Sequence, residues 1–362
     1  MGFGAFCDAP SVTSMATRDF PENDWLTGVP GPDVDVAQMD HAIQEISTNP
    51  SEFGANMALV VVHKGRIVRE IYGEGVTAES TLISWSVAKS ITHALVGIAV
   101  KDGILSISDS NLFPHWQDER ARITLGNLLN MSSGLAWCED YVNDSISDVI
   151  EMLFGDGEFA GDHAMYASAK ALEATPGSKY MYSSGTTNLV TRILAVALGE
   201  KNSSSEIVET FMRQRLFEPI GINSAIPKFD DTGNFVGSSF VYAIARDFAR
   251  FGYLYLNDGV WGDNRLLPEG WVQYGRTAIA LDPENGLEYG AHWWMSPEDP
   301  GSMTAMGYEG QFTWISPERD LVLVRLGKTN NELVPALREK LVQIIRSFPA
   351  QGSEIGNDST HG

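Results

Sequence analysis

The sequence predicts an α+β fold, in which an antiparallel sheet flanked by helices carries an inserted helical lobe. Two observations point to this fold class. Short runs of β-branched and other apolar residues lie near both ends of the chain, whereas residues 86–256 are dominated by helical periodicity. A sheet assembled from both chain ends leaves the helical middle as an insertion, so the 362 residues are expected to divide into two lobes.

The first strands are expected after an irregular N-terminal arm, residues 1–35, which is rich in Pro, Gly and Asp and lacks periodicity. Residues 36–47 then have helical spacing. The β-rich runs at residues 57–63 and 66–72 are joined by a Lys-Gly pair, which is a typical hairpin signal. Residues 36–85 are therefore predicted to form the first part of the sheet lobe.

The helical lobe is expected over residues 86–256 and begins with the segment that carries the candidate nucleophile. Apolar residues recur there every three or four positions, as in helices that bury one face. The helical patterns include residues 87–100, 189–198, 206–216 and 245–256.

The chain is expected to return to the sheet lobe over residues 257–349. Residues 311–316 and 321–327 indicate two strands around the tight turn Pro-Glu-Arg-Asp, and residues 332–348 indicate a closing amphipathic helix. The polar segment 350–362 is expected to be a disordered tail.

Composition argues against several classes of function. The chain has 25 basic and 47 acidic residues, and its formal net charge of −22 repels nucleic acids and anionic membranes. No apolar run is long enough to span a membrane, and the N-terminus lacks the pattern of a secretory signal. The 2 cysteines cannot form a disulfide framework. We therefore expect a cytoplasmic protein that binds neither nucleic acid nor membrane.

Common cofactor and metal motifs are missing or incomplete. The chain contains no G-x-S-x-G and no H-E-x-x-H, and its 7 histidines lack the spacing of a zinc site. Residues 73–78 match a loose G-x-G-x-x-A pattern, but no helix is predicted after them, which argues against a dinucleotide site. No cofactor and no metal are predicted.

One pattern favours nucleophilic catalysis. Ser86 is followed three residues later by Lys89, which places both side chains on one face at the start of an almost continuously apolar helix. A serine hydroxyl becomes a nucleophile when a base takes its proton, and lysine can be that base if burial lowers its pKa. The chain has a single S-x-x-K, although a helix N-cap serine beside an incidental lysine would give the same pattern.

Three further segments, in the right order, make the chain similar to the serine β-lactamase and penicillin-binding-protein superfamily. ITLGNLLNMSSGLAW at residues 123–137 resembles the segment after the S-x-x-K helix, and PGSKYMYSSGTTNLV at 176–190 resembles the motif of a tyrosine followed by Ser-Asn. MGYEGQFTWISPERDLVLVRL at 306–326 resembles the third motif, written K-T-G or H-x-G. The resemblance covers roughly residues 57–348, is closest to the branch of 6-aminohexanoate-dimer hydrolases and class C-like carboxylesterases, and implies a β-lactamase-like fold.

The resemblance implies catalytic roles for individual residues. Ser86 would attack the carbonyl carbon, Lys89 would take its proton, and Tyr182 would pass a proton to the leaving group. The oxyanion would lie between the backbone N–H groups of Ser86 and Gln311, and Gly310 would allow the substrate to approach closely.

Three more residues are candidates for substrate contact. Tyr141 resembles a substrate-contacting tyrosine of the nylon-oligomer branch, although an ordinary half-buried loop tyrosine would look the same. Ser184 stands in place of the asparagine of the tyrosine motif, and Tyr308 stands in place of the lysine or histidine of the third motif. In penicillin-recognising relatives that cation helps to bind the substrate carboxylate, so its replacement argues against penicillins.

The predicted function is that of a serine hydrolase that cleaves ester or amide bonds of small molecules through an acyl-enzyme, as a carboxylesterase or a 6-aminohexanoate-oligomer-type amidase. A β-lactamase or D,D-peptidase is the alternative among enzymes, and a catalytically dead binding protein on the same scaffold is the alternative outside them. The sequence leaves open the physiological substrate, the preference between ester and amide, and the oligomeric state, with a homodimer as one option. It also leaves open whether Tyr141, Trp293 and Trp294 line the pocket.

Overall fold

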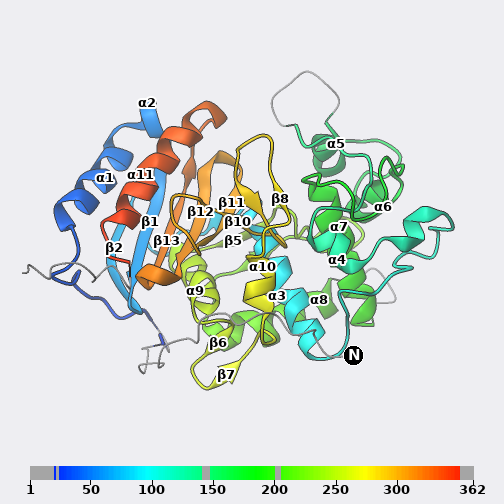
Figure 1. Cartoon of the computed structure of the whole chain (residues 1–362), viewed down its shortest axis with the longest axis horizontal. Coiled ribbons are helices and arrows are strands. Elements are labelled where there is room, and N and C mark those ends of the chain that lie inside the picture. Colours follow the sequence, from blue (N-terminus) through cyan, green and yellow to red (C-terminus); the bar gives the residue numbers. More distant parts are fainter. Residues whose placement is uncertain (1–19, 22–23, 141–146, 200–204, 351–362) are drawn as a thin grey trace, which may run out of the picture.

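Strands from the two ends of the chain lie side by side in one antiparallel sheet. The computed structural model describes residues 20–21, 24–140, 147–199 and 205–350. Within these residues the main sheet has eight strands in the order β2-β1-β13-β12-β11-β10-β9-β8 (Figure 1). The first two strands are β1 (Ala55–His63) and β2 (Arg66–Tyr72), and β1 also pairs along its length with β13 (Leu321–Lys328). The predicted α+β class is confirmed.

Two tight turns set the registers at the centre of this sheet. Lys64 and Gly65 join β1 to β2 with φ angles of 52° and 76°, so the predicted hairpin is confirmed. Strand β12 (Gln311–Ser316) pairs with β13 through the short turn η5 (Pro317–Arg319), which ends at Asp320 with φ 48°. The Pro-Glu-Arg-Asp segment is therefore a turn, as predicted.

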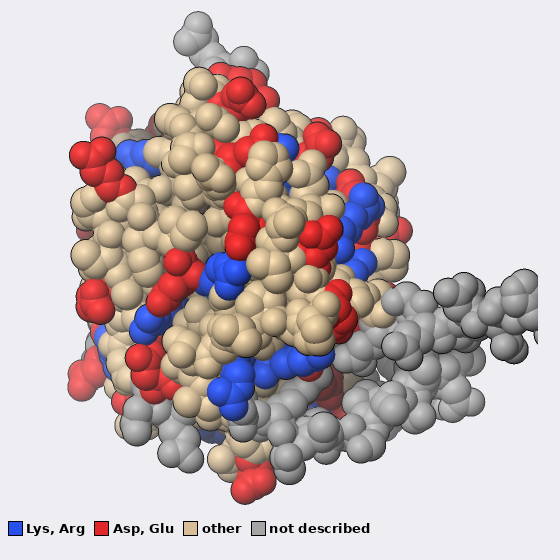
Figure 2. Space-filling view, turned by 90° about the vertical axis from the view of Figure 1, so that its left-hand side faces the viewer, with Lys and Arg blue, Asp and Glu red and all other residues tan. Residues whose placement is uncertain are grey.

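Helices cover both faces of the sheet. Leu59 and Val61 pack with α1 (Val36–Thr48) and α11 (Val334–Arg346) in one apolar cluster, whereas Val60 and Val62 belong to the main core on the opposite face. Because successive strand residues point to opposite faces, burial of both faces explains the continuous apolar run in β1. Helices α1 and α11 lie side by side in Figure 1, next to the short α2 (Pro50–Phe53). On the outer surface of that side, acidic and basic side chains are interspersed (Figure 2).

The remaining strands of the sheet lead toward the helical lobe. Strand β11 (Met303–Gly307) pairs with β12 across the one-turn helix η4 (Tyr308–Gly310). The outer strands are β8 (Ala280–Leu281), β9 (Glu288–Tyr289) and β10 (Trp294–Met295). In the described part of the chain, the other strands form two small sheets. One contains β3 (Leu82–Ile83), β4 (Ile226–Pro227) and β5 (Val241–Ala243), and the other contains β6 (Val260–Trp261) and β7 (Asn264–Arg265).

The helical lobe is built mainly from short helices around the long α3 and α7. Its α-helices are α3 (Val87–Lys101), α4 (Leu125–Leu129), α5 (Asp148–Phe154), α6 (His163–Ser168), α7 (Ser184–Ala197) and α8 (Glu206–Met212). The same lobe also contains the single helical turns η1 (Glu119–Arg122), η2 (Arg213–Phe217) and η3 (Glu218–Ile220). Two further short helices, α10 (Trp271–Gly275) and η6 (Asn331–Leu333), lie later in the chain.

Helix α9 (Ala245–Leu256) lies on the sheet, although its residues were expected to belong to the helical lobe. A Cβ added to Gly252 would stand 2.7 Å from Val322 Cγ1 and 3.0 Å from Thr313 Cγ2, so this glycine lets the helix approach β13 and β12 closely. Its periodicity identifies a helix but does not say which layer the helix joins.

Two predicted terminal segments fall partly outside the described residues. Residues 1–19 and 22–23 of the expected arm and residues 351–362 of the expected tail are not described. In the described part of the arm, Trp25 is buried and its indole N–H donates to the Arg246 carbonyl (3.0 Å) at the start of α9. Within the described ranges, the helices lack the length and hydrophobicity that a membrane span requires.

Candidate active site

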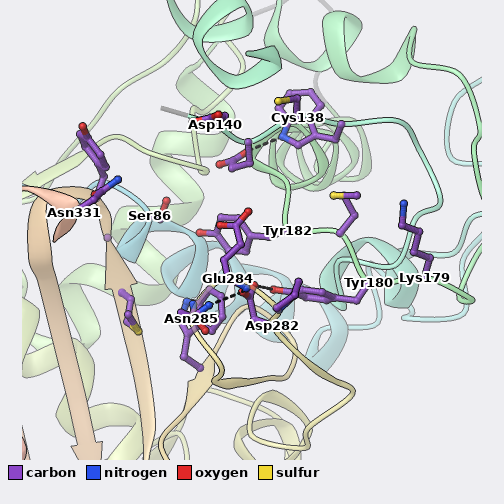
Figure 3. A pocket seen from close by; sticks show the side chains of 18 residues that line it. Ser86, Cys138, Asp140, Lys179, Tyr180, Tyr182, Asp282, Glu284, Asn285 and Asn331 are labelled. Carbon is purple, nitrogen blue, oxygen red and sulfur yellow. Dashed lines mark hydrogen bonds between the residues drawn. The ribbon is translucent and has the colours of Figure 1, made fainter. Parts of the chain in front are cut away.

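The first turn of helix α3 positions the candidate nucleophile. Just before it, Ser84 is held against strand β5, because its N–H donates to the Val241 carbonyl (2.9 Å) and its Oγ accepts from the Val241 N–H (3.0 Å). Ser86 is the N-cap residue of α3. It therefore sits where the sheet meets the helical lobe, and it lines a cavity there (Figure 3).

Lys89 is buried directly behind Ser86, with only 2% of its surface exposed. Its Nζ donates to Ser86 Oγ (2.9 Å), to Ser184 Oγ (2.9 Å) and to the Ser238 carbonyl (3.0 Å). Burial lowers the pKa of Lys89 to about 8, against the opposing effect of the Glu139 carboxylate. Lys89 thus becomes neutral at a pH where a solvent-exposed lysine is still almost fully charged.

Ser184, which replaces the motif's asparagine, connects Lys89 to a carboxylate. Its hydroxyl donates to Glu139 Oε1 (2.5 Å), and its backbone N–H donates to Glu139 Oε2 (2.9 Å). The indole N–H of Trp137 also donates to Glu139 Oε2 (2.5 Å). Because this carboxylate accepts the Ser184 proton, the Ser184 oxygen is left to accept from Lys89. No local pattern indicates this connection, since Glu139 and Ser184 are 45 positions apart.

Tyr182 stands over the amine of Lys89. The Nζ atom lies 4.8 Å from the centre of the Tyr182 ring, which also packs against Trp294 with 5.5 Å between ring centres. Burial raises the pKa of Tyr182, Glu139 raises it further, and a hydrogen-bonding contact with the Ser86 side chain acts in the opposite direction. Tyr182 is therefore a neutral phenol, able to donate a proton near the serine oxygen.

The cavity at Ser86 has a volume of about 800 Å³, which is large enough for a small organic substrate. Its walls come from the segment after α4, the segment before α7, the β8–β9 hairpin and the end of β11 (Figure 3). The lining residues are Ser86, Trp137, Cys138, Glu139, Asp140, Lys179, Tyr180, Met181, Tyr182, Asp282, Pro283, Glu284, Asn285, Trp294, Met306, Gly307, Tyr308 and Asn331.

The cavity wall is strongly acidic. Glu139, Asp140, Asp282 and Glu284 line it, and Lys179 is the one lysine or arginine among the lining residues. Burial raises the pKa of Glu284, and Asp282, Glu139 and Asp140 raise it further, in that order. The carboxylates thus repel one another across the cavity, and a bound cation would relieve that repulsion.

A hairpin loop presents two of these carboxylates. Asp282, at the end of β8, accepts from the Tyr180 hydroxyl (2.9 Å) and from the backbone N–H groups of Glu284 (2.8 Å) and Asn285 (3.2 Å). These bonds fold the loop into a compact turn, part of which is visible in Figure 3. Asp282 is itself 4% exposed, so it shapes the wall, whereas Glu284 is exposed.

The third motif reaches the cavity through its first residues. Tyr308 lines the cavity as expected, but Gly310 and Gln311 do not belong to its walls. The chain turns at η4, so Gln311 pairs back with Gly307 in the neighbouring strand, and its side chain is 1% exposed. Gly307 is the glycine of close approach, because a Cβ there would stand 2.5 Å from the Ser84 carbonyl oxygen.

The other residues considered for the pocket wall differ in where they lie. Trp294 lines the cavity, whereas Trp293 is fully buried in the core and stacks on Phe251 with 6.0 Å between ring centres. Tyr141 lies outside the described residues. Among the residues that the structure does describe, no three His, Cys, Asp or Glu side chains gather so as to hold a metal ion.

Comparison with known proteins shows relatives over most of the chain. The family model described as Beta-lactamase matches residues 51–344. The 6-aminohexanoate-dimer hydrolase of Paenarthrobacter ureafaciens is 25% identical over 288 residues, which cover 74% of this chain and 71% of that protein.

Solved structures share the fold. A "putative 6-aminohexanoate-dimer hydrolase" from Bacillus anthracis superposes with a TM-score of 0.73 at 20% identity, covering 92% of this chain and 91% of that one. EstCE1, a hydrolase with promiscuous acyltransferase activity, gives a TM-score of 0.65 at 15% identity and covers 86% of this chain and 98% of its own. At these identities the likeness is one of fold.

Proposed function

Since the chain belongs to the Beta-lactamase family, we propose that it is a serine hydrolase that cleaves ester or amide bonds of small molecules through an acyl-enzyme at Ser86. The observation that carries this proposal is the contact of 2.9 Å between Lys89 Nζ and Ser86 Oγ, made by a buried lysine beside an open cavity. It supplies both requirements of the S-x-x-K mechanism, a base within reach of the nucleophile and a low-dielectric site that lowers its pKa.

The partners of Lys89 orient its lone pair. The Ser238 carbonyl can only accept, and Ser184 gives its own proton to Glu139, so both take protons from the amine. When Lys89 is neutral, its two protons satisfy these acceptors and its lone pair is left to face Ser86 Oγ. With a pKa of about 8, roughly one molecule in ten has this form at pH 7.

In the acylation step, each proton that leaves one group is taken up by another. Neutral Lys89 takes the Ser86 proton as the serine oxygen forms a bond to the carbonyl carbon, and the carbonyl electron pair moves onto its oxygen. As the oxyanion collapses, the bond to the leaving group breaks, and that group receives a proton from Tyr182, which regains one from the Lys89 ammonium. Water repeats the sequence on the acyl-enzyme, with Lys89 as the base and Ser86 as the leaving group.

We place the oxyanion between the backbone N–H groups of Ser86 and Tyr308, in place of Ser86 and Gln311. Tyr308 lines the cavity with Ser86, and the preceding Gly307 is packed against Ser84. Gln311, by contrast, is buried, pairs with Gly307 of the neighbouring strand and is not among the lining residues. Each such donor typically contributes about 10² to 10³ in rate.

The acidic cavity favours substrates with a protonated amine over substrates whose only charge is a carboxylate. Four carboxylates and one lysine line it, so a free carboxylate on the substrate would face mostly negative charge. This charge pattern supports an amidase for linear amino-amides or an esterase over a penicillin-directed enzyme. It agrees with the name of the Paenarthrobacter relative, a 6-aminohexanoate-dimer hydrolase.

A comparison of three substrates tests this function. We expect kcat/KM for p-nitrophenyl butyrate, which has no carboxylate, to exceed that for nitrocefin by about 10- to 150-fold, the factor expected when a charge-assisted hydrogen bond to the carboxylate is missing. The linear 6-aminohexanoate dimer also carries a carboxylate, but its protonated amine is attracted to the acidic wall, so its kcat/KM should exceed that for nitrocefin as well. A nitrocefin value tenfold above both others would replace the proposal with the β-lactamase alternative. The absence of turnover for all three would favour the binding-protein alternative.

The role of Glu284 gives a separate prediction. Replacing Glu284→Gln removes one negative charge from the cavity wall, so KM for the aminohexanoate dimer should rise about 3- to 10-fold, while KM for the uncharged p-nitrophenyl butyrate stays within twofold. Glu288→Gln is the matched control, because Glu288 is exposed on the same hairpin and does not line the cavity. An equal rise in KM for both substrates would contradict charge recognition.

A further inference from the structure

Two residues with strained backbones flank the proposed oxyanion site. Trp85 directly precedes Ser86 and has φ 44°, and Glu309 directly follows Tyr308 and has φ 59°. Residues with a Cβ rarely occupy this left-handed region, and an aromatic residue there is unusual. Such conformations persist only where the surrounding structure holds them, and they gather at functional sites.

The side chains of these two residues are bonded to each other. The Trp85 indole N–H donates to Glu309 Oε2 (3.2 Å), and the Trp85 ring meets the Tyr308 ring edge-on with 5.5 Å between ring centres. The two segments approach each other closely at Gly307, since a Cβ there would stand 3.1 Å from Trp85 Cβ. The segment before the nucleophile and the turn after β11 are therefore in direct contact.

The turn itself is anchored from behind. Arg325 is fully buried on β13, and its Nη1 donates to the carbonyls of Gly310 (2.8 Å) and Glu309 (3.3 Å). The Gln311 side-chain amide donates to the Tyr308 carbonyl (2.9 Å). All three carbonyls of η4 are thus held by buried donors, which fix the backbone of the turn relative to the sheet.

We propose that the Trp85–Glu309 hydrogen bond acts as a clasp that fixes the distance between the two oxyanion N–H groups. It joins the residue before Ser86 to the residue after Tyr308, so it ties the nucleophile segment to a turn that Arg325 already holds in place. Trp85 and Glu309 are then positioning residues. This inference rests on the proposed function, because it assumes that the N–H groups of Ser86 and Tyr308 bind the oxyanion.

A clasp of this kind acts on the transition state. The oxyanion forms only during the reaction, so a misplaced N–H group lowers kcat and leaves KM nearly unchanged. We expect Glu309→Ala and Trp85→Phe each to lower kcat for p-nitrophenyl butyrate by about 10- to 100-fold, with KM within about twofold. Glu309→Gln keeps an oxygen that can accept the indole proton and should remain within about threefold of the wild type.

The experiment measures kcat, KM and the inhibition constant of phenylboronic acid for these variants and for the double variant W85F/E309A. Phenylboronic acid forms a tetrahedral adduct with a catalytic serine, so its affinity should fall in parallel with kcat. If the two residues act only through their shared bond, the double variant should be no worse than either single variant. Glu318→Ala is the control, since Glu318 is exposed in η5 at the far end of β12.

Each result is decisive. The clasp is supported by a loss of kcat and of boronate affinity in Glu309→Ala, its rescue in Glu309→Gln and non-additivity in the double variant. A wild-type kcat in Glu309→Ala, or equal impairment of Glu309→Gln and Glu309→Ala, would overturn the clasp while leaving the proposed function intact. A wild-type protein that neither turns over the ester nor binds the boronate would overturn both proposals.

Discussion

Replacing Ser86→Ala is expected to lower kcat/KM for p-nitrophenyl butyrate by at least about 10⁴-fold, because the acyl-enzyme cannot form without the serine oxygen. The fold should survive the change. Lys89 keeps its bonds to Ser184 and to the Ser238 carbonyl, so the buried amine retains two of its three acceptors. Steady-state hydrolysis of the ester by both purified proteins measures the effect.

Ser90→Ala is the matched control for that variant. Ser90 lies one turn further along α3, and its hydroxyl donates to the His292 carbonyl (2.8 Å), away from the cavity lining. Removing this hydroxyl should lower the thermal midpoint of unfolding, whereas kcat/KM should stay close to the wild-type value. A Ser86→Ala protein that keeps a tenth or more of wild-type kcat/KM would show that another residue is the nucleophile.

The second large effect is expected for Lys89→Met. Methionine preserves an unbranched apolar stem but cannot take a proton, so kcat/KM should fall by about 10² to 10⁴, the usual contribution of a positioned general base. Because the substitution also removes the cost of burying a charge, the protein should remain folded. Circular dichroism and a thermal melt check that the loss of activity is not a loss of structure.

The pH profile tests the same residue in the wild-type protein. The active form has neutral Lys89, and burial lowers the pKa of Lys89 from its usual 10.5 to about 8. The value of kcat/KM should therefore rise about tenfold per pH unit below pH 8 and level off above it. A constant value between pH 6 and 9, or an inflection near pH 8 that persists in Lys89→Met, would contradict a role for Lys89 as the base.

The fold could be predicted largely because its strands carry strong local signals. The runs that became β1, β2, β12 and β13 combine β-branched residues with turn residues at fixed spacing, and the structure pairs them as hairpins. The lobe that receives α9 could not be predicted, since an amphipathic helix fits either a sheet or other helices. Gly252 admits α9 onto the sheet, but the residues that it approaches, Val322 and Thr313, are far from it in the sequence.

The reactive centre was predictable in part for a related reason. Ser86 and Lys89 are neighbours on one helix, so their contact follows from helical geometry alone. The third motif was harder, because Gly307 and Gly310 are both near Tyr308 and the sequence does not show where the strand ends. The pairing of Gly307 with Gln311 sets where β11 ends and β12 begins, and that pairing depends on the whole sheet.

Contacts between distant segments were not predictable. The bond between Ser184 and Glu139 and the bond between Trp85 and Glu309 join residues that are 45 and 224 positions apart. No local periodicity relates such pairs, and only the assembled core brings them together. The same holds for the acidic wall, where the β8–β9 loop adds Asp282 and Glu284 to carboxylates from another part of the chain.

The most direct test of the central claim is intact-mass spectrometry of the full chain after reaction with a fluorophosphonate probe. The probe modifies serines that a neighbouring base has activated. We predict one adduct per molecule, located by peptide mapping on Ser86 and absent from Ser86→Ala. A wild-type protein that takes up no label, or a label that persists in Ser86→Ala, would contradict the assignment of Ser86 as the acylated nucleophile.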